Sequence, residues 1–274
     1  MDLSGRWALV TGASRGLGAA IAKRLAAAGA KLILTARDPA GLNQIAAELK
    51  CAKVIPADLA DPAQVERLLD ACDGVEIIIN NAGVQGPIGP FTSADFNAWQ
   101  AVFQINFFAP ARICQRLIEP MKKIGRGKIV NVSGGGATSP RPDFSAYGAA
   151  KCALVRLTET LAQELAGTGI DVNCMAPGAM NTQMLEQLLA AGPAAASREY
   201  AKALKQKQSG GASPESAAEL AAFLASPASD GITGRLLSAV WDNWADLPAR
   251  REDLRNSDIY TLRRIVPADR GRKW

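Results

Sequence analysis

Short apolar runs rich in Val and Ile alternate along the chain with stretches whose apolar residues recur at helical spacing. The runs cover residues 7–10, 31–36, 53–57, 75–80, 128–132 and 170–173. Helices are predicted at 17–28, 40–49 and 62–70, and longer ones at 95–121 and 145–166. Strands that alternate with helices of about 10 to 15 residues indicate βαβ units with right-handed crossovers. Because the strands are apolar throughout, we expect an α/β fold with a doubly wound parallel sheet in a single domain.

Two regions interrupt this alternation. Residues 182–214 have a helical composition but contain Gly192-Pro193 and Gly210-Gly211, which is typical of a mobile flap inserted between core elements. Residues 241–274 are rich in charged and aromatic side chains. We therefore expect a main domain at 1–240, which includes the flap, and a C-terminal extension at 241–274 that lies over the domain or a neighbouring subunit.

The chain of 274 residues contains no His, which excludes the imidazole base of serine-hydrolase triads and the commonest zinc ligand. The five cysteines form no C-x-x-C pair, so neither a zinc knuckle nor a disulfide framework is predicted. We expect free thiols in a reducing cytoplasm and no metal site. The cysteines are Cys51, Cys72, Cys114, Cys152 and Cys174.

Membrane and nucleic-acid partners are not predicted. No uncharged apolar run approaches the roughly 18 residues of a membrane span. The net charge is +5, from 31 Lys and Arg against 26 Asp and Glu, but the basic residues are dispersed rather than aligned on one element. A solvated basic surface is the favoured interpretation.

A glycine-rich turn, TGASRGLG at residues 11–18, joins the first predicted strand to an Ala-rich helix. Glycines at such a turn let the backbone bend tightly and approach a pyrophosphate, which the N–H groups and the positive end of the helix dipole stabilise. The spacing differs from the common G-x-G-x-x-G pattern. Taken alone, it leaves open a turn that serves only helix packing.

Residues that distinguish NAD from NADP follow the second strand. Asp38, about 20 residues after the turn, would accept hydrogen bonds from the ribose hydroxyls of NAD, whereas Arg37 would pair with the 2′-phosphate of NADP. Arg15 adds a second cation, and two cations converging on a dianion favour NADP. Because Asp38 precedes Pro39, a helix cap is the alternative role for this carboxylate.

Three further motifs occur in order: NNAG at 80–83, Ser133 after the strand at 128–132, and Tyr147-x-x-x-Lys151 at helical spacing. With the turn at 11–18, they make the chain resemble the short-chain dehydrogenase/reductase family in its compact form, over residues 5–240. The resemblance implies a Rossmann fold and NAD(P)-dependent oxidoreduction of a small-molecule carbonyl or alcohol substrate. NADP(H) is the expected cofactor and NAD(H) the less favoured one.

The resemblance also assigns a cofactor site. Ala36 falls where NAD-dependent members carry a ribose-binding Asp, and Arg37 falls where NADP-dependent members carry a phosphate-binding Arg. Residues 58–59 are expected at the adenine, 81–83 at the ribose and nicotinamide, and 177–182 at the nicotinamide amide. The implied cofactor-binding residues are Gly12, Ser14, Arg15, Gly16, Leu17, Gly18, Arg37, Asp58, Leu59, Asn81, Ala82, Gly83, Tyr147, Lys151, Pro177, Gly178, Met180 and Thr182.

The chemistry of the Tyr-Lys pair agrees with the resemblance. A free Tyr titrates near pH about 10, and an ammonium one helical turn away, with the positive oxidised nicotinamide, lowers that pKa. Tyr147 would exchange a proton with the substrate oxygen, and Ser133 would polarise that oxygen. By resemblance, Asn106 would fix a water that relays protons from Lys151. Taken singly, Tyr147 and Lys151 would be interpreted as an exposed helix pair, Ser133 as a loop serine and Asn106 as an amide that packs between helices. The occurrence of all four in this order favours catalysis.

Substrate contacts are expected from 85–96, 134–144 and the flap, whose Ala and Leu residues indicate a moderately apolar pocket. The extension departs from the family, and we expect Trp241, Trp244 and the tail through Arg263-Arg264 to cap the active-site mouth of the same or a partner subunit. The resemblance implies a homodimer or homotetramer that assembles through the helices at 95–121 and 145–166.

Other functions stay open at this point. One is a 3-oxoacyl-type reductase or a sugar or polyol dehydrogenase that uses NAD. A second is a non-catalytic NADP-sensing regulatory protein, which the intact Ser133, Tyr147 and Lys151 set speaks against, since a sensor needs no proton donor. The third, nucleic-acid binding by the basic tail, is weakened by its interleaved acidic residues.

Overall fold

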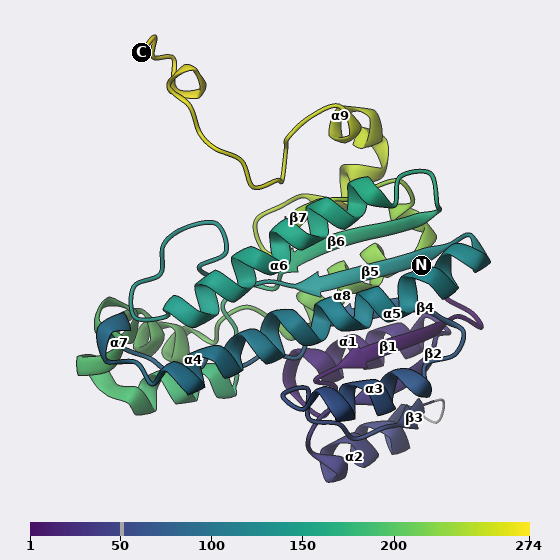
Figure 1. Ribbon diagram of the computed structural model, residues 1–274, viewed down its shortest axis with the longest axis horizontal. Helices are drawn as coiled ribbons and strands as arrows, with labels where there is room; N and C mark the ends of the chain where they lie inside the picture. Colours follow the sequence, from purple (N-terminus) through teal and green to yellow (C-terminus); the bar gives the residue numbers. More distant parts are fainter. Residues whose placement is uncertain (50–51) are drawn as a thin grey trace.

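A seven-stranded parallel sheet forms the centre of the computed structural model, which describes residues 1–49 and 52–274 (Figure 1). Within these residues the strand order is β3-β2-β1-β4-β5-β6-β7. The order reverses between β1 and β4, and ligands of such sheets bind outside the carboxyl ends of the strands at this reversal. The strands are β1 Trp7–Thr11, β2 Lys31–Thr35, β3 Ala52–Val54, β4 Val75–Asn80, β5 Gly127–Val132, β6 Ile170–Ala176 and β7 Leu236–Ser238.

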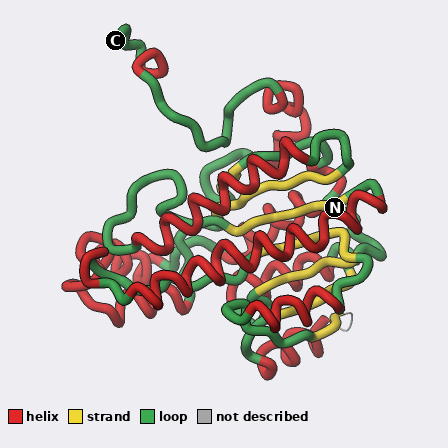
Figure 2. The backbone as a smooth tube through the Cα atoms, viewed as in Figure 1, coloured by secondary structure: helices red, strands yellow, loops and turns green. Residues whose placement is uncertain are grey.

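Helices cover both faces of the sheet, as the sequence predicts for buried parallel strands (Figure 2). On β1, Ala8 and Val10 face a core shared with α1, α2 and α8, whereas Leu9 faces a core shared with α3, α5 and α6. The predicted doubly wound α/β fold is therefore confirmed. The helices are α1 Gly16–Ala27, α2 Pro39–Leu49, α3 Pro62–Asp70, α4 Phe96–Phe103, α5 Ala109–Ile124, α6 Ser145–Glu164, α7 Gln183–Ser209, α8 Pro214–Ala225 and α9 Arg251–Arg255.

Some predicted boundaries are wrong. The single helix expected at 95–121 is divided by a π-helical segment, Gln104–Phe108, between α4 and α5. Pro110 lacks the N–H that the carbonyl of Asn106 would accept in a regular α-helix, which favours this wider turn. The strand expected at 53–57 is shorter, and β7 has no counterpart among the predicted strands because its three residues carry too little periodic pattern. Cys51 lies outside the described residues; Cys72, Cys114, Cys152 and Cys174 are free thiols.

The flap, residues 182–214, lies beyond the carboxyl ends of β5 and β6 (Figure 1). Its helix α7 is broken between Gly192 and Ser197, which have positive φ angles of 79° and 35°. Leu185 and Leu188 of the flap pack against Phe144 and Tyr147 in a small apolar cluster. The flap thus covers the N-terminal end of α6.

The C-terminal extension packs on the domain at its start and leaves it at its end. Trp244 lies against Phe223 of α8 with ring centroids 5.4 Å apart, and Leu247 and Leu254 are buried in the same core. The guanidinium of Arg235 donates hydrogen bonds to the carbonyls of residues 257 and 259 at 3.0 and 2.7 Å. Leu262 is also bound to α6, since its N–H donates to the Glu159 carboxylate at 2.6 Å, and beyond it the chain runs away from the body (Figure 1). Trp244 is therefore part of the core and does not cap an active-site mouth.

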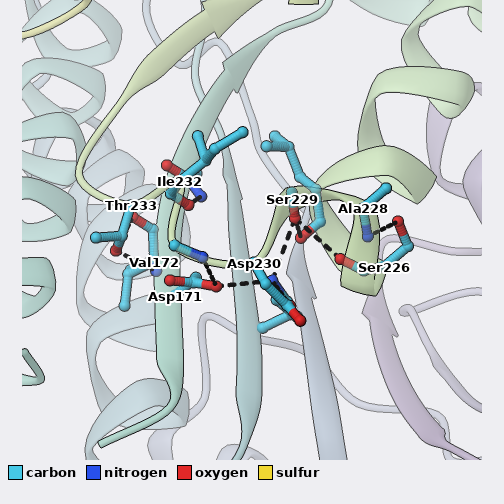
Figure 3. Close-up of polar contacts among 12 residues, drawn as sticks. Asp171, Val172, Ser226, Ala228, Ser229, Asp230, Ile232 and Thr233 are labelled. Atoms are coloured by element: carbon cyan, nitrogen blue, oxygen red, sulfur yellow. Dashed lines mark hydrogen bonds and ion pairs between the residues drawn. The ribbon is translucent and has the colours of Figure 1, made fainter. Parts of the chain in front are cut away.

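A buried ion-pair network holds the opposite end of the sheet. Lys128 on β5 contacts Asp171 on β6 and Asp230 after α8, each at 2.7 Å. Asp171, Ser229 and Asp230 lie together at this end (Figure 3), and burial raises the pKa of the Asp171 carboxyl. This network lies at the amino ends of β5 and β6, far from their carboxyl ends, so its role is structural.

In the described part of the chain, no helix is long and apolar enough to cross a membrane.

Candidate active site

A cavity of about 660 Å³ opens at the carboxyl ends of the central strands. All the predicted site residues except Asn106 and Gly178 line it, although they come from segments far apart in the sequence. Ala36, Asp38, Val84, Ile105, Asn181, Gln183 and Met184 line it as well. The cavity therefore joins the glycine-rich turn, the NNAG motif and the Ser-Tyr-Lys set in one space.

The glycine-rich turn is held close to the NNAG loop. A side chain at Gly18 would place its Cβ 2.1 Å from the carbonyl oxygen of Gly12, so only glycine fits there. The Asn81 Nδ2 donates to the carbonyl of Thr11 at 2.9 Å, and this fixes the turn against the end of β4. Helix α1 starts here without a side-chain cap and without an acidic residue in its first turn. Its first N–H groups are thus free for an anion, as a pyrophosphate requires.

Two guanidinium groups and one carboxylate lie at the far end of the cavity. Arg15 and Arg37 are exposed, and neither guanidinium forms a hydrogen bond or ion pair with another described residue. The Oδ1 of Asp38 accepts the backbone N–H of Ala40 at 3.1 Å, in the first turn of α2. The helix-cap alternative for Asp38 is therefore confirmed, while both cations remain available to a ligand.

Asp58 and Leu59 form the side of the cavity beyond β3. The Oδ1 of Asp58 accepts the backbone N–H of Ala60 at 2.9 Å, and its own N–H donates to the side chain of Gln64. Leu59 is buried with α3. These contacts fix the loop in which a planar adenine ring could lie.

Tyr147 and Lys151 lie one turn apart on α6, next to Ser133 at the end of β5. The Lys151 ammonium donates to the carbonyl of Val132 at 2.7 Å and lies 5.9 Å from the centre of the Tyr147 ring. The Oγ of Ser133 is buried and has no hydrogen-bond partner. A Cβ at Gly134 would approach the Tyr147 hydroxyl to 2.2 Å. The sequence analysis includes Gly134 in a segment expected to contact substrate, but the need for glycine at this position is visible only in space.

Burial dominates the pKa values of this pair. It raises the pKa of the Tyr147 hydroxyl and lowers the pKa of the Lys151 ammonium to about 8. The cation that lowers the pKa of Tyr147 is Arg141, whose guanidinium carbon lies 5.8 Å from the ring centre. In the chain without a ligand, Lys151 is turned toward the backbone of β5, so the expected lowering of the Tyr147 pKa by Lys151 together with the oxidised nicotinamide stays a prediction for the cofactor complex.

Asn106 lies behind the cavity and not on its wall. It is fully buried in the π-helical segment, and its amide binds both backbone polar groups of Val84. A Cβ at Gly83 would lie 3.3 Å from Asn106 Oδ1 and 3.5 Å from Lys151 Nζ. Asn106, behind the cavity, and Lys151, on its wall, therefore approach the same side of Gly83.

A second cavity of about 520 Å³ continues from Ser133 and Tyr147 toward the flap. Gly178, the remaining predicted residue, lines this one. Its walls come from all three segments expected to contact substrate, and Trp241 of the extension lies at its edge with 85% of its surface exposed. Its charged groups are Arg141, Glu199 and Lys202, and Glu199 pairs with both cations at 3.3 and 3.0 Å.

The chain is similar to known proteins over most of its length. A family model described as short chain dehydrogenase matches residues 6–192. The 3beta-hydroxysteroid dehydrogenase 1 of Eggerthella lenta is 35% identical over 246 residues, which cover 86% of this chain and 92% of that protein.

Two solved structures share the fold. A gluconate 5-dehydrogenase from Burkholderia cenocepacia, in complex with NADP and tartrate, has a TM-score of 0.75 and 29% identity, covering 86% of this chain and 94% of that one. A 3-ketoacyl-(acyl-carrier-protein) reductase from Brucella melitensis, complexed with NADH, has a TM-score of 0.76 and 32% identity. The match covers 86% of this chain and 97% of that one.

Proposed function

Because the chain belongs to the short-chain dehydrogenase/reductase family, whose members act on CH–OH and C=O groups, we propose that it is an NADP(H)-linked oxidoreductase of a small carbonyl or secondary-alcohol substrate. The cofactor assignment rests on one observation, namely which of three side chains at the far end of the cavity already have a partner in the protein. Arg15 and Arg37 have no partner among the described residues, whereas Asp38 is engaged at α2. Two free cations fit the 2′-phosphate of NADP.

The rest of the cavity fits a dinucleotide. The uncapped start of α1 would bind the pyrophosphate, and the loop at Asp58 and Leu59 would hold the adenine. Lys151 would hydrogen-bond the nicotinamide ribose, and residues 177–182 would surround the amide. Structures of the similar proteins hold NADP in one case and NADH in another, so the family alone does not decide between them.

The nicotinamide, when bound, supplies or accepts the hydride. Tyr147 then donates its hydroxyl proton to the carbonyl oxygen during reduction, and removes that proton during oxidation. Ser133, whose buried Oγ has no partner, donates a hydrogen bond to the same oxygen. Arg141 favours the Tyr147 phenolate, and so does Lys151 while it is charged, below pH about 8. Asn106, behind Gly83 and Lys151, would fix a water that returns protons to Lys151.

Two alternative functions receive less support. A 3-oxoacyl reductase would be expected to present a free basic face to its acidic carrier protein, whereas Lys202 and Lys207 of the flap pair with Glu199 and Glu186, which leaves Arg198 and Lys205 as its cations without an ion pair to another described residue. A non-catalytic NADP sensor would need no unpartnered Ser133 beside Tyr147. We therefore propose a catalyst of a small-molecule carbonyl or alcohol substrate, acting in the cytoplasm.

A titration of fluorescence with NADPH and NADH tests the cofactor assignment. Wild type is expected to bind NADPH more tightly, and Arg37→Asp to weaken NADPH binding about 10- to 100-fold while improving NADH. Arg250→Asp, which makes the same charge change on the extension, is the control and should resemble wild type. Equal binding of both dinucleotides by wild type would contradict the NADP(H) assignment.

We also propose that the protein forms a homodimer or homotetramer. A groove between α5 and α6 is lined by Phe108, Ala111, Leu157 and Leu161, and Phe108 is 53% exposed. Small and apolar residues on two neighbouring helices suit the packing of a second copy. Light scattering of wild type and Ala111→Arg tests this: the variant should have a lower mass, and a monomeric wild type would contradict it.

A further inference from the structure

Gln85 has a side-chain amide buried in the second cavity without a partner. The residue is 4% exposed, its Oε1 has no hydrogen-bond partner, and the amide forms no hydrogen bond with another described residue. Of the buried side-chain polar atoms without partners in the described chain, only those of Gln85 and Ser133 line this cavity or the dinucleotide cavity. Ser133 already has a partner in the proposed reaction, namely the reacting oxygen. The Gln85 amide has none.

Contacts of the neighbouring residues hold the backbone from which the Gln85 side chain lines the cavity. Val84, the preceding residue, is bound at both polar groups by Asn106, at 2.9 and 2.8 Å. Gly86, the following residue, has a φ of 73°, and a Cβ there would lie 2.1 Å from a methyl of Val102. A little further on, the N–H of Gly89 donates to the carbonyl of Asp143 at 2.9 Å.

The position of Gln85 identifies the part of the ligand that it meets. Gln85 lines the second cavity but not the dinucleotide cavity, whereas Ser133 and Tyr147 line both. A group that contacts Gln85 therefore belongs to the substrate and not to the cofactor. Leu185 and Leu188 of the flap also line the second cavity, and their side chains offer no polar atom to the amide.

We propose that Gln85 binds a hydroxyl group of the substrate next to the reacting carbonyl, so that the enzyme prefers α-hydroxy ketones and vicinal diols. An amide presents an acceptor oxygen and two donor hydrogens, and a hydroxyl both donates and accepts, so a hydroxyl beside Gln85 supplies the donor that its buried Oε1 lacks. A substrate without that hydroxyl leaves the amide unpaired, which is the strongest basis for discrimination in a closed pocket. The inference rests on the proposed function, because it assumes turnover of a carbonyl at Ser133 and Tyr147.

The test compares two ketones that differ by one hydroxyl, 3-hydroxybutan-2-one and butan-2-one, with NADPH. Wild type should favour the hydroxy ketone in kcat/KM by about tenfold or more, and Gln85→Met should bring the ratio to within about threefold of unity. Gln163→Met is the matched control: Gln163 is an exposed glutamine on α6 that lines neither cavity, and its variant should keep the wild-type ratio. Wild type without preference, or Gln85→Met with an unchanged ratio, would overturn the proposal.

A thermal denaturation of the protein without ligand separates recognition from a structural role. Gln85→Met replaces an amide that has no partner with an apolar side chain of similar shape. The Tm of this variant should therefore be equal to or above that of wild type. A lower Tm by several degrees would show that the amide has a partner within the protein, and would also overturn the proposal. If neither ketone is reduced and NADPH does not bind, the proposed function itself fails; if NADPH binds and both ketones react equally, only the assignment of Gln85 fails.

Discussion

Asn106 binds the backbone of Val84 at both of its polar groups. Its Nδ2 donates to the Val84 carbonyl at 2.8 Å, and its Oδ1 accepts the Val84 N–H at 2.9 Å. The pair connects the π-helical segment between α4 and α5 to the loop that follows β4. Because this loop carries Gly83 and Gln85, one buried amide positions parts of both cavities.

Asn106→Leu should destabilise the protein by about 2 to 4 kcal/mol, because both polar groups of Val84 would stay buried without partners. Urea denaturation measures this change. Asn97→Leu is the control on the neighbouring helix α4, where the side chain is exposed, and should change stability by no more than about 0.5 kcal/mol. Equal stability of the two variants would show that the Asn106 bonds are not needed.

Lys151 gives the stability a specific pH dependence. Burial lowers its pKa from 10.5 to about 8 in the folded protein, so between these values the unfolded chain binds more protons. The stability contribution of Lys151 should therefore rise with pH from about 8 to 10.5, by up to roughly 3 kcal/mol. Urea denaturation of wild type and of Lys151→Met across this pH range isolates the effect. The surface variant Lys123→Met is the control, and its stability should change with pH as that of wild type does. If the free energy of unfolding of wild type, minus that of Lys151→Met, stays constant or falls as the pH rises through this range, the lowered pKa of the buried Lys151 amine would be contradicted.

Trp241 and Trp244 should behave differently although they lie three residues apart. Trp244 packs on Phe223, and Trp244→Ala should cost about 2 to 4 kcal/mol of the free energy of unfolding. Trp241 is 85% exposed at the edge of the second cavity, so Trp241→Ala should change stability by no more than about 0.5 kcal/mol but raise the KM for substrate. Similar losses of stability in both variants would refute this division of roles.

Local patterns in the sequence predict the layered fold, and the resemblance to the short-chain dehydrogenase/reductase family predicts most of the residues that line the dinucleotide cavity. Apolar runs identify the strands, and glycine, Ser133, Tyr147 and Lys151 occur in a recognisable order. Parallel strands then bring their carboxyl ends to one edge of the sheet, which places these residues together without further information.

Features that depend on packing between distant segments could not be predicted in this way. The proximity of Arg141 to Tyr147, the burial of the Gln85 amide and the contact between Trp244 and Phe223 each join residues whose spacing carries no pattern. Helical spacing predicts only that Tyr147 and Lys151 share a face of α6, and it does not predict that the Lys151 ammonium binds the Val132 carbonyl. Sequence thus identified the chemistry, while tertiary contacts decide its pKa values and specificity.

The most direct test of the central claim compares wild type and Tyr147→Phe in NADPH-dependent reduction of 3-hydroxybutan-2-one, with NADPH binding measured in parallel. The ring of Tyr147 packs against Phe144 and Leu185, and phenylalanine keeps that contact while removing the proton donor. We predict a rate lower by about 10²- to 10⁴-fold with an NADPH Kd within about twofold of wild type. A variant that binds NADPH and retains the wild-type rate would contradict the role of Tyr147 and with it the proposed mechanism.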